Sequence, residues 1–159
     1  MHMSRSQPKL NAKIGLIVTS ILSLVNAGIG TMIAVKENLP SVTPILTTGK
    51  PALEDFLTGN GTALSPPLYL CIVTLLLIVL AFLPKWPGMV GVVGLTILGV
   101  IFLLGEFVET NTYRALNPVA FNLPVALVIL AEIVLALLMI AFGVVAIVQQ
   151  RQAHRQAAQ

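Results

Sequence analysis

The run Pro124–Val148, PVALVILAEIVLALLMIAFGVVAIV, decides the fold because it is long and apolar enough to cross a bilayer. A hydrocarbon core of about 30 Å requires roughly 20 apolar residues in a helix. The run carries one carboxylate, Glu132, and an acidic side chain at membrane depth normally faces protein or water rather than lipid. We therefore predict a spanning helix whose Glu132 side points into a helix bundle.

The composition of the whole chain agrees with this prediction. Of its 159 residues, 57% are hydrophobic and 9% are charged, whereas about a quarter of the residues of a soluble domain are charged. This excludes an ordinary globular enzyme. The single cysteine, Cys71, allows neither an intrachain disulfide nor a cysteine metal cluster. The small excess of basic residues is explained by membrane orientation, so no nucleic-acid partner is expected.

Four apolar runs follow one another along the chain and predict an all-α integral membrane protein with a four-transmembrane-helix bundle. The expected helices lie at about residues 14–35, 66–83, 88–110 and 124–148. Between them we expect outer loops at 36–65 and 111–123, and a tight turn at 84–87. Residues 14–148 are thus one domain, with a cytoplasmic lead at 1–13 and a cytoplasmic tail at 149–159 that is expected to fray.

The basic residues predict the orientation of the bundle. The two ends of the chain and the tight turn hold six of the nine, namely Arg5, Lys9, Lys13, Lys85, Arg151 and Arg155. The opposite side holds Lys36, Lys50 and Arg114. By the positive-inside rule, both termini lie in the cytoplasm, under a plasma membrane or a bacterial inner membrane.

The first apolar run, Ile14–Val35, has an alternative interpretation as a secretory signal peptide. A basic lead precedes it, and the triplet Val25–Ala27 is one that a signal peptidase could accept. Since the apolar character continues to Val35, beyond the length of a typical signal core, we favour a spanning helix.

The first outer loop is expected to contain a short helix at Pro51–Thr58, with proline in its first turn and Gly59 as its stop. Its apolar face covers the outer mouth of the bundle, lies on the lipid headgroups or docks a partner, and we favour the first. The nearby Asn60-Gly61-Thr62 fits the N-glycosylation sequon, which matters only in a eukaryotic secretory setting.

Small residues on the predicted helices indicate where the helices pack together. On a helical wheel, Gly91, Gly94 and Gly99 share one side of the third helix, and Gly143 lies on the Glu132 side of the fourth. Small residues let helix backbones approach closely in lipid, so these four are predicted helix-packing positions. The first helix has a similar side, made of Thr19, Ser23, Asn26, Ala27, Gly30 and Ala34.

The chemistry that the sequence offers is concentrated at the outer end of the bundle. Glu132 lies eight residues past Pro124, roughly 12 Å along a helix, and Glu106 lies near the outward end of its own helix. We therefore hypothesise that Glu106 and Glu132, with Asn26 below them, line a polar pocket that opens outward and favours a shared proton or a bound cation.

Three alternatives stay open for these acidic groups. Arg114 could neutralise one of the two carboxylates. Glu132 could instead be a buried acid that hydrogen-bonds to a neighbouring helix purely for packing. Glu109, at the end of the third helix, is expected to be solvated.

An enzyme is not expected. Both histidines, His2 and His154, lie outside the apolar runs, and no phosphate-binding glycine loop or nucleophile elbow is present. We expect neither a cofactor nor a metal site. The chain is then a small membrane protein that acts by binding, either as an accessory subunit of a membrane complex or as a receptor for a lipophilic ligand. The alternative is a proton- or cation-coupled transporter that works as a homo-oligomer.

Overall fold

The computed structural model describes residues 8–42, 49–115, 117–118 and 121–157, which form six helices and no β-sheet. The helices are α1 (Pro8–Glu37), α2 (Ala52–Thr58), α3 (Leu68–Phe82), α4 (Lys85–Val108), α5 (Thr110–Ala115) and α6 (Leu123–Ala157). The predicted all-helical class is confirmed, and α2 occupies the segment for which a short helix is expected.

Three of these helices contain segments that are long and apolar enough to cross a membrane, namely Ala12–Glu37, Lys85–Val108 and Leu123–Gln152. The fourth apolar helix, α3, has 15 residues. At about 1.5 Å per residue it is shorter than a hydrocarbon core of about 30 Å.

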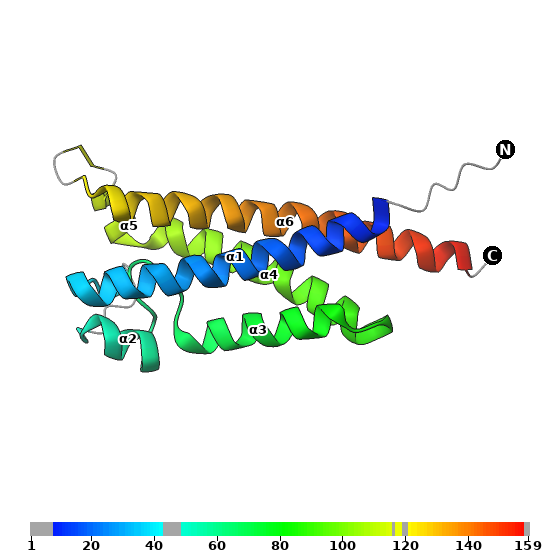
Figure 1. Ribbon diagram of the computed structural model, residues 1–159, viewed down its shortest axis with the longest axis horizontal. Helices are drawn as coiled ribbons and strands as arrows, with labels where there is room; N and C mark the ends of the chain where they lie inside the picture. The colour runs from blue at the N-terminus through cyan, green and yellow to red at the C-terminus, as the bar shows by residue number, and fades with distance from the viewer. Residues whose placement is uncertain (1–7, 43–48, 116, 119–120, 158–159) are drawn as a thin grey trace.

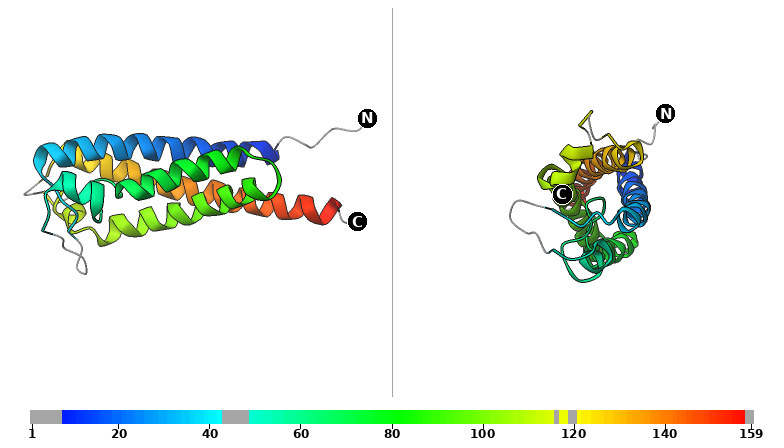
Figure 2. Two further views of the ribbon diagram at one scale, coloured as in Figure 1. Left: turned by 90° about the horizontal axis from the view of Figure 1, so that it is seen from below. Right: turned by 90° about the vertical axis from the view of Figure 1, so that its left-hand side faces the viewer.

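The four apolar helices, α1, α3, α4 and α6, run side by side along the long axis of the molecule (Figure 1). The helix α6 packs against both α1 and α4, and α3 packs mainly against α4. The start of α1 and the end of α6 lie at one end of the bundle, which we call the terminal end, while α2 and α5 lie at the other, the loop end (Figures 1 and 2).

Both outer helices are longer than the sequence predicts. The helix α1 begins at Pro8 rather than near residue 14, because proline is tolerated in a first helical turn. The tail that was expected to fray is helical to Ala157, since the glutamine, arginine and alanine residues that follow Val148 are good helix formers. An apolar run therefore identifies the segment of a helix that is suited to lipid, but it does not identify the residues at which the helix begins and ends.

The helix α4 differs from its prediction at both ends. It begins at Lys85, with Pro87 in its first turn, and it ends at Val108. Glu109 has an extended backbone conformation, and the short helix α5 follows directly. The predicted outer loop at 111–123 thus contains a helix that the sequence analysis did not identify.

Glycines determine which neighbour α4 approaches along its length. A Cβ atom on Gly91 would lie 2.7 Å from both Ala81 Cα and Leu77 O of α3, and one on Gly94 would lie 2.9 Å from Leu77 Cδ1. Further along α4, a Cβ on Gly99 would lie 3.0 Å from Met139 Cβ of α6. From the terminal end to the loop end, α4 therefore passes from close contact with α3 to close contact with α6.

The terminal half of the bundle contains the larger apolar core. Its most deeply buried side chains include Leu16 of α1, Val92 and Leu95 of α4, and Met139 of α6, which belong to one apolar cluster. Gly143 belongs to this half as well, where a Cβ would lie 2.8 Å from Thr96 Cβ. The loop half has a smaller apolar cluster and most of the buried polar groups.

Candidate functional site

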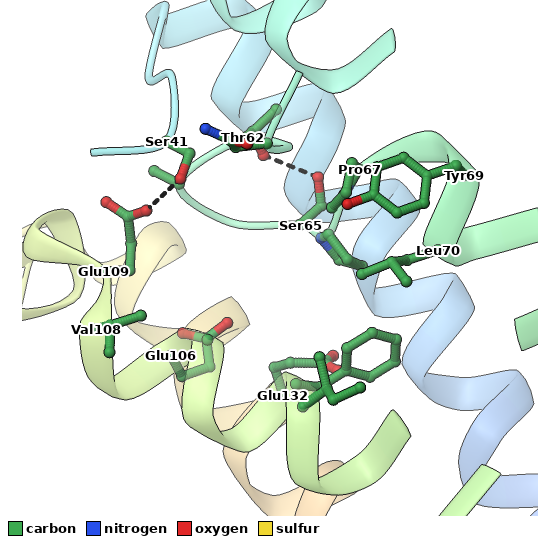
Figure 3. A pocket seen from close by; sticks show the side chains of 16 residues that line it. Ser41, Thr62, Ser65, Pro67, Tyr69, Leu70, Glu106, Val108, Glu109 and Glu132 are labelled. Carbon is green, nitrogen blue, oxygen red and sulfur yellow. Dashed lines mark hydrogen bonds between the residues drawn. The ribbon is translucent and has the colours of Figure 1, made fainter. Parts of the chain in front are cut away.

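A cavity of about 250 Å³ lies at the loop end. The helices α3 and α4 diverge there (Figure 2). Pro67, Tyr69 and Leu70 line it on the α3 side. Glu106 and Val108 face them from α4, as Figure 3 shows. The start of α3 and the end of α4 are therefore the two walls of the cavity.

The segment between α2 and α3 covers the cavity, and hydroxyl groups hold it by hydrogen bonds within the segment and to α1. Thr62 Oγ1 and Ser65 Oγ lie 2.8 Å apart, and Thr31 of α1 donates to Ser65 Oγ at 2.8 Å. Gly61 has a φ of +100° and its Cβ position would lie 2.6 Å from Ser65 O, so this turn requires glycine. The cover is thus a defined turn with its polar groups paired.

Glu132 lies at the inner end of the cavity and is 4% exposed. Ser23 Oγ donates to its Oε1 at 2.6 Å, and Asn26 Nδ2 donates to its Oε2 at 3.0 Å. Asn26 Nδ2 also lies 3.1 Å from Val128 O. The carboxylate accepts one hydrogen bond on each oxygen from α1, and each oxygen keeps a further lone pair.

Glu106 faces the same cavity from α4 and is less buried than Glu132. Among the described residues it contacts Thr112 of α5, whose Oγ1 lies 3.4 Å from Glu106 Oε2, near the limit for a hydrogen bond. The structure thus places Glu106 and Glu132 on one cavity, with Asn26 in contact with Glu132.

Glu109 is buried, and the expectation that it is solvated is wrong. It accepts hydrogen bonds from Ser41 Oγ at 2.8 Å and from Val42 N at 3.0 Å, while Thr110 N donates to Val42 O at 2.9 Å. The break between α4 and α5 therefore holds the segment that follows α1 across the top of the cavity. This segment is polar in sequence, so its return to the bundle could not be predicted from hydrophobic periodicity.

A second buried carboxylate near the cover, that of Asp55 in α2, was not predicted from the sequence either. It is 0% exposed and accepts hydrogen bonds from Ser41 N at 3.3 Å and Asn60 N at 3.0 Å. The available signal was its place four residues before Gly59, within a short predicted helix. Asp55 and Glu109 hold Ser41 from two sides.

Among the described residues, Glu106 and Glu132 are compensated by hydrogen bonds. An ion pair joins Lys50 and Glu54, on the outside of the loop end. Arg114, proposed above as a neutralising cation, belongs to α5, but its side chain lies outside the described residues. Within the described ranges, histidine, cysteine and acidic side chains form no group of three suited to a metal.

The arrangement combines apolar walls, hydroxyl groups at the cover and three carboxylates around one space. Such a site can bind a small molecule that is partly apolar and offers hydrogen-bond donors or positive charge to carboxylates. Compared with protein families, curated proteins and solved structures, the chain matches none of them. The function is therefore argued from this geometry alone.

Proposed function

We propose that the chain is an integral membrane protein with four spans and cytoplasmic termini that binds a lipophilic ligand in the cavity at its loop end. The cavity is the observation that carries the proposal. A concave site with mostly apolar walls and a few convergent polar groups is the usual form of a small-molecule site. Here Leu70 and Phe102 represent the apolar walls, and Glu106 and Glu132 the polar groups.

The topology that this function requires is supported by charge and helix length. The terminal end carries the basic residues of the lead, the turn and the tail, which favours the cytoplasmic side of a plasma membrane or a bacterial inner membrane. The short helix α3 crosses together with Pro66 and Pro67, which precede it. The cavity then lies toward the outer face.

The alternative function is a proton- or cation-coupled transporter that works as a homo-oligomer, with Glu132 and Glu106 as the coupling groups. A carboxylate at membrane depth is typical of proton and ion pathways. However, a transporter also requires a path beyond it, and below Glu132 the interior is filled by Leu95, Leu98 and Met139, each at most 5% exposed. This packing favours binding over transport.

The proposal is tested by isolating the protein from its native membrane in mild detergent and identifying bound molecules by mass spectrometry. A stoichiometric lipophilic molecule is expected. A Gly105→Leu variant should lose the ligand, because Gly105 lines the cavity and a leucine side chain there would occupy its space. The variant should still fold, since a Cβ at this position would meet nothing within 4 Å. Gly28→Leu is the matched control, since Gly28 is equally open but lies on the outside of α1.

Two results would overturn the proposal. The first is a ligand that stays bound to Gly105→Leu as firmly as to the unmodified protein. The second is a stoichiometric protein partner with no small molecule, which would identify the chain as an accessory subunit and reduce the glutamates to packing groups.

A further inference from the structure

We infer that the ligand is an amphiphile with a cationic amine head, and that it enters the cavity sideways from the lipid, between α3 and α4. The inference rests on the proposed function and specifies the chemical class of its ligand. Three features of the structure carry it: a lateral opening, two carboxyl groups that face the cavity without a described cation beside them, and the small size of the cavity.

The lateral opening follows from the path of α4. Beyond Gly94, α4 leaves α3 and packs against α6 through Gly99, while Gly105 has no neighbour within 4 Å of its Cβ position. Side chains that line the cavity are at the same time exposed on the outside of the bundle, with Tyr69 57% exposed and Val108 51% exposed. In a membrane these side chains face lipid, so the cavity is open to the bilayer.

The charge of the head follows from the carboxylates. Glu132 receives its hydrogen bonds from Ser23 and Asn26 on the α1 side, and Glu106 has one bond of 3.4 Å. No described cation pairs with either of them. Carboxylates in apolar surroundings are stable when a cation and hydrogen-bond donors compensate them, and an ammonium group supplies both. An anionic head is disfavoured, because three acidic side chains, Glu106, Glu109 and Glu132, line the cavity.

The size of the cavity indicates that only the head enters it. Its volume of about 250 Å³ lies below the roughly 300–1,000 Å³ of sites that enclose a drug-sized ligand. Because the opening faces lipid, an apolar tail can remain among the acyl chains while the head reaches Glu106 and Glu132. An amine-headed membrane lipid and a free lipophilic amine share this chemistry.

The test compares three probes with the same chain, dodecylamine, dodecanol and dodecanoate, on the full-length protein in maltoside micelles. Calorimetric titration should show dodecylamine binding at least tenfold more tightly than dodecanol, with dodecanoate weakest. Glu106→Gln combined with Glu132→Gln should remove that preference and leave dodecanol unchanged. Glu54→Gln is the control, since Glu54 is an exposed acid of α2 outside the cavity.

The outcomes separate this inference from the proposed function. Equal binding of dodecylamine and dodecanol, both blocked by Gly105→Leu, would overturn the cationic head and leave lipophilic binding in place. Binding of none of the three probes, together with no ligand in the isolated protein, would overturn both. Reconstitution in phosphatidylglycerol vesicles with and without phosphatidylethanolamine identifies the source, because retained phosphatidylethanolamine shows that the lipid itself supplies the amine.

The sideways entry has its own measurement. Stearylamine with a nitroxide in the middle of its chain should, when bound, be relaxed by oxygen dissolved in lipid and be protected from a water-soluble nickel complex. A nitroxide protected from both reagents would place the tail inside the protein and overturn lateral entry. Relaxation by nickel would overturn it as well, since it would place the tail in the outer aqueous phase.

Discussion

The two halves of this bundle use the same helices for different purposes. In the terminal half, α4 touches α3 backbone to backbone at Gly91, and the interior is filled by aliphatic side chains such as Leu95 and Met139. In the loop half, the interior contains Glu132, Glu109 and a cavity. The interior of the terminal half is filled by apolar side chains, whereas the interior of the loop half contains buried polar groups and a cavity.

A small helical bundle can in this way combine a rigid, packed half with a half that contains a binding site. Close contact through glycine brings α3 and α4 together at one end, and the angle between them then separates them at the other. The buried polar groups of the loop half are each held by hydrogen bonds from a neighbouring segment, which limits the cost of burying them. The packed half thus supports the geometry of the open half.

The largest effect is expected from breaking the contact between α3 and α4 in the terminal half. Gly91→Ala places a methyl group 2.7 Å from backbone atoms of Ala81 and Leu77, which cannot move aside as a side chain can. Overpacking of this kind lowers the free energy of unfolding by about 1–3 kcal/mol. Thermal unfolding in detergent should show the loss, and Gly91→Leu should give little folded protein.

The matched substitution Gly28→Ala introduces the same methyl group on α1, where nothing lies within 4 Å. It should leave the unfolding temperature unchanged or raise it slightly, since alanine is favoured over glycine in a helix by up to about 1 kcal/mol. A Gly91→Ala protein as stable as Gly28→Ala would contradict the close-packed description of the terminal half.

In the loop half, Asp55→Ala is expected to loosen the cover of the cavity. It leaves Ser41 N and Asn60 N without their buried acceptor, and an unsatisfied buried donor costs about 1–3 kcal/mol. Hydrogen exchange should accelerate at these two amides and remain slow in the terminal half. The control Glu54→Ala removes an exposed pair with Lys50, worth about 0–1 kcal/mol, and faster exchange there too would contradict a specific role for Asp55.

Helical periodicity was sufficient to predict the buried sides of α1 and α6. On the predicted inner side of α1, all the small and polar residues from Thr19 to Ala34 are buried, while Val25 and Met32 on the other side are exposed. The Glu132 side of α6 is buried in the same way. Ile17 is an exception, since it lies opposite the small, polar side on a helical wheel and is nevertheless 5% exposed. A wheel works here because helices in a bundle bury one side each.

The features that the sequence could not predict are the contacts made by the polar segments that connect the helices. Ser41 and Val42 lie in a segment without periodicity, so nothing indicated that they return to Glu109. The burial of Glu109 follows from that return and not from its own helix. Glu132 was found because a carboxylate is conspicuous in an apolar run, whereas Asp55 lies in a polar loop where an acidic residue attracts no attention.

A smaller effect on the free energy of unfolding is expected from removing the hydrogen bond between Ser23 and Glu132. This substitution tests whether the buried polar groups of the loop half contribute to stability. Ser23→Ala removes the 2.6 Å bond to Glu132 and should cost about 1 kcal/mol. Replacing the whole set, with Ser23→Ala, Asn26→Leu and Glu132→Leu, should restore or raise the unfolding temperature, because apolar groups of similar volume often replace a buried polar set without loss.

The same triple variant should lose dodecylamine binding, because it lacks a carboxylate at the inner end of the cavity. A binder that became both more stable and inactive would show that these polar groups are kept for a ligand. A triple variant that unfolds more readily than Ser23→Ala alone would instead make Glu132 a packing group, and the two halves would then differ only in composition.

The smallest effect is expected from removing the end of α6, which continues past the terminal end of the bundle (Figure 1). Arg151 and Gln152 are exposed, so the helix there has no tight packing to lose. Ending the chain after Gln152 should lower the helical circular dichroism signal slightly and leave the unfolding temperature unchanged. If the temperature fell, helix length would contribute to the stability of the terminal half; if it did not, that stability would come from contacts between helices, of which Gly91 makes the closest with α3.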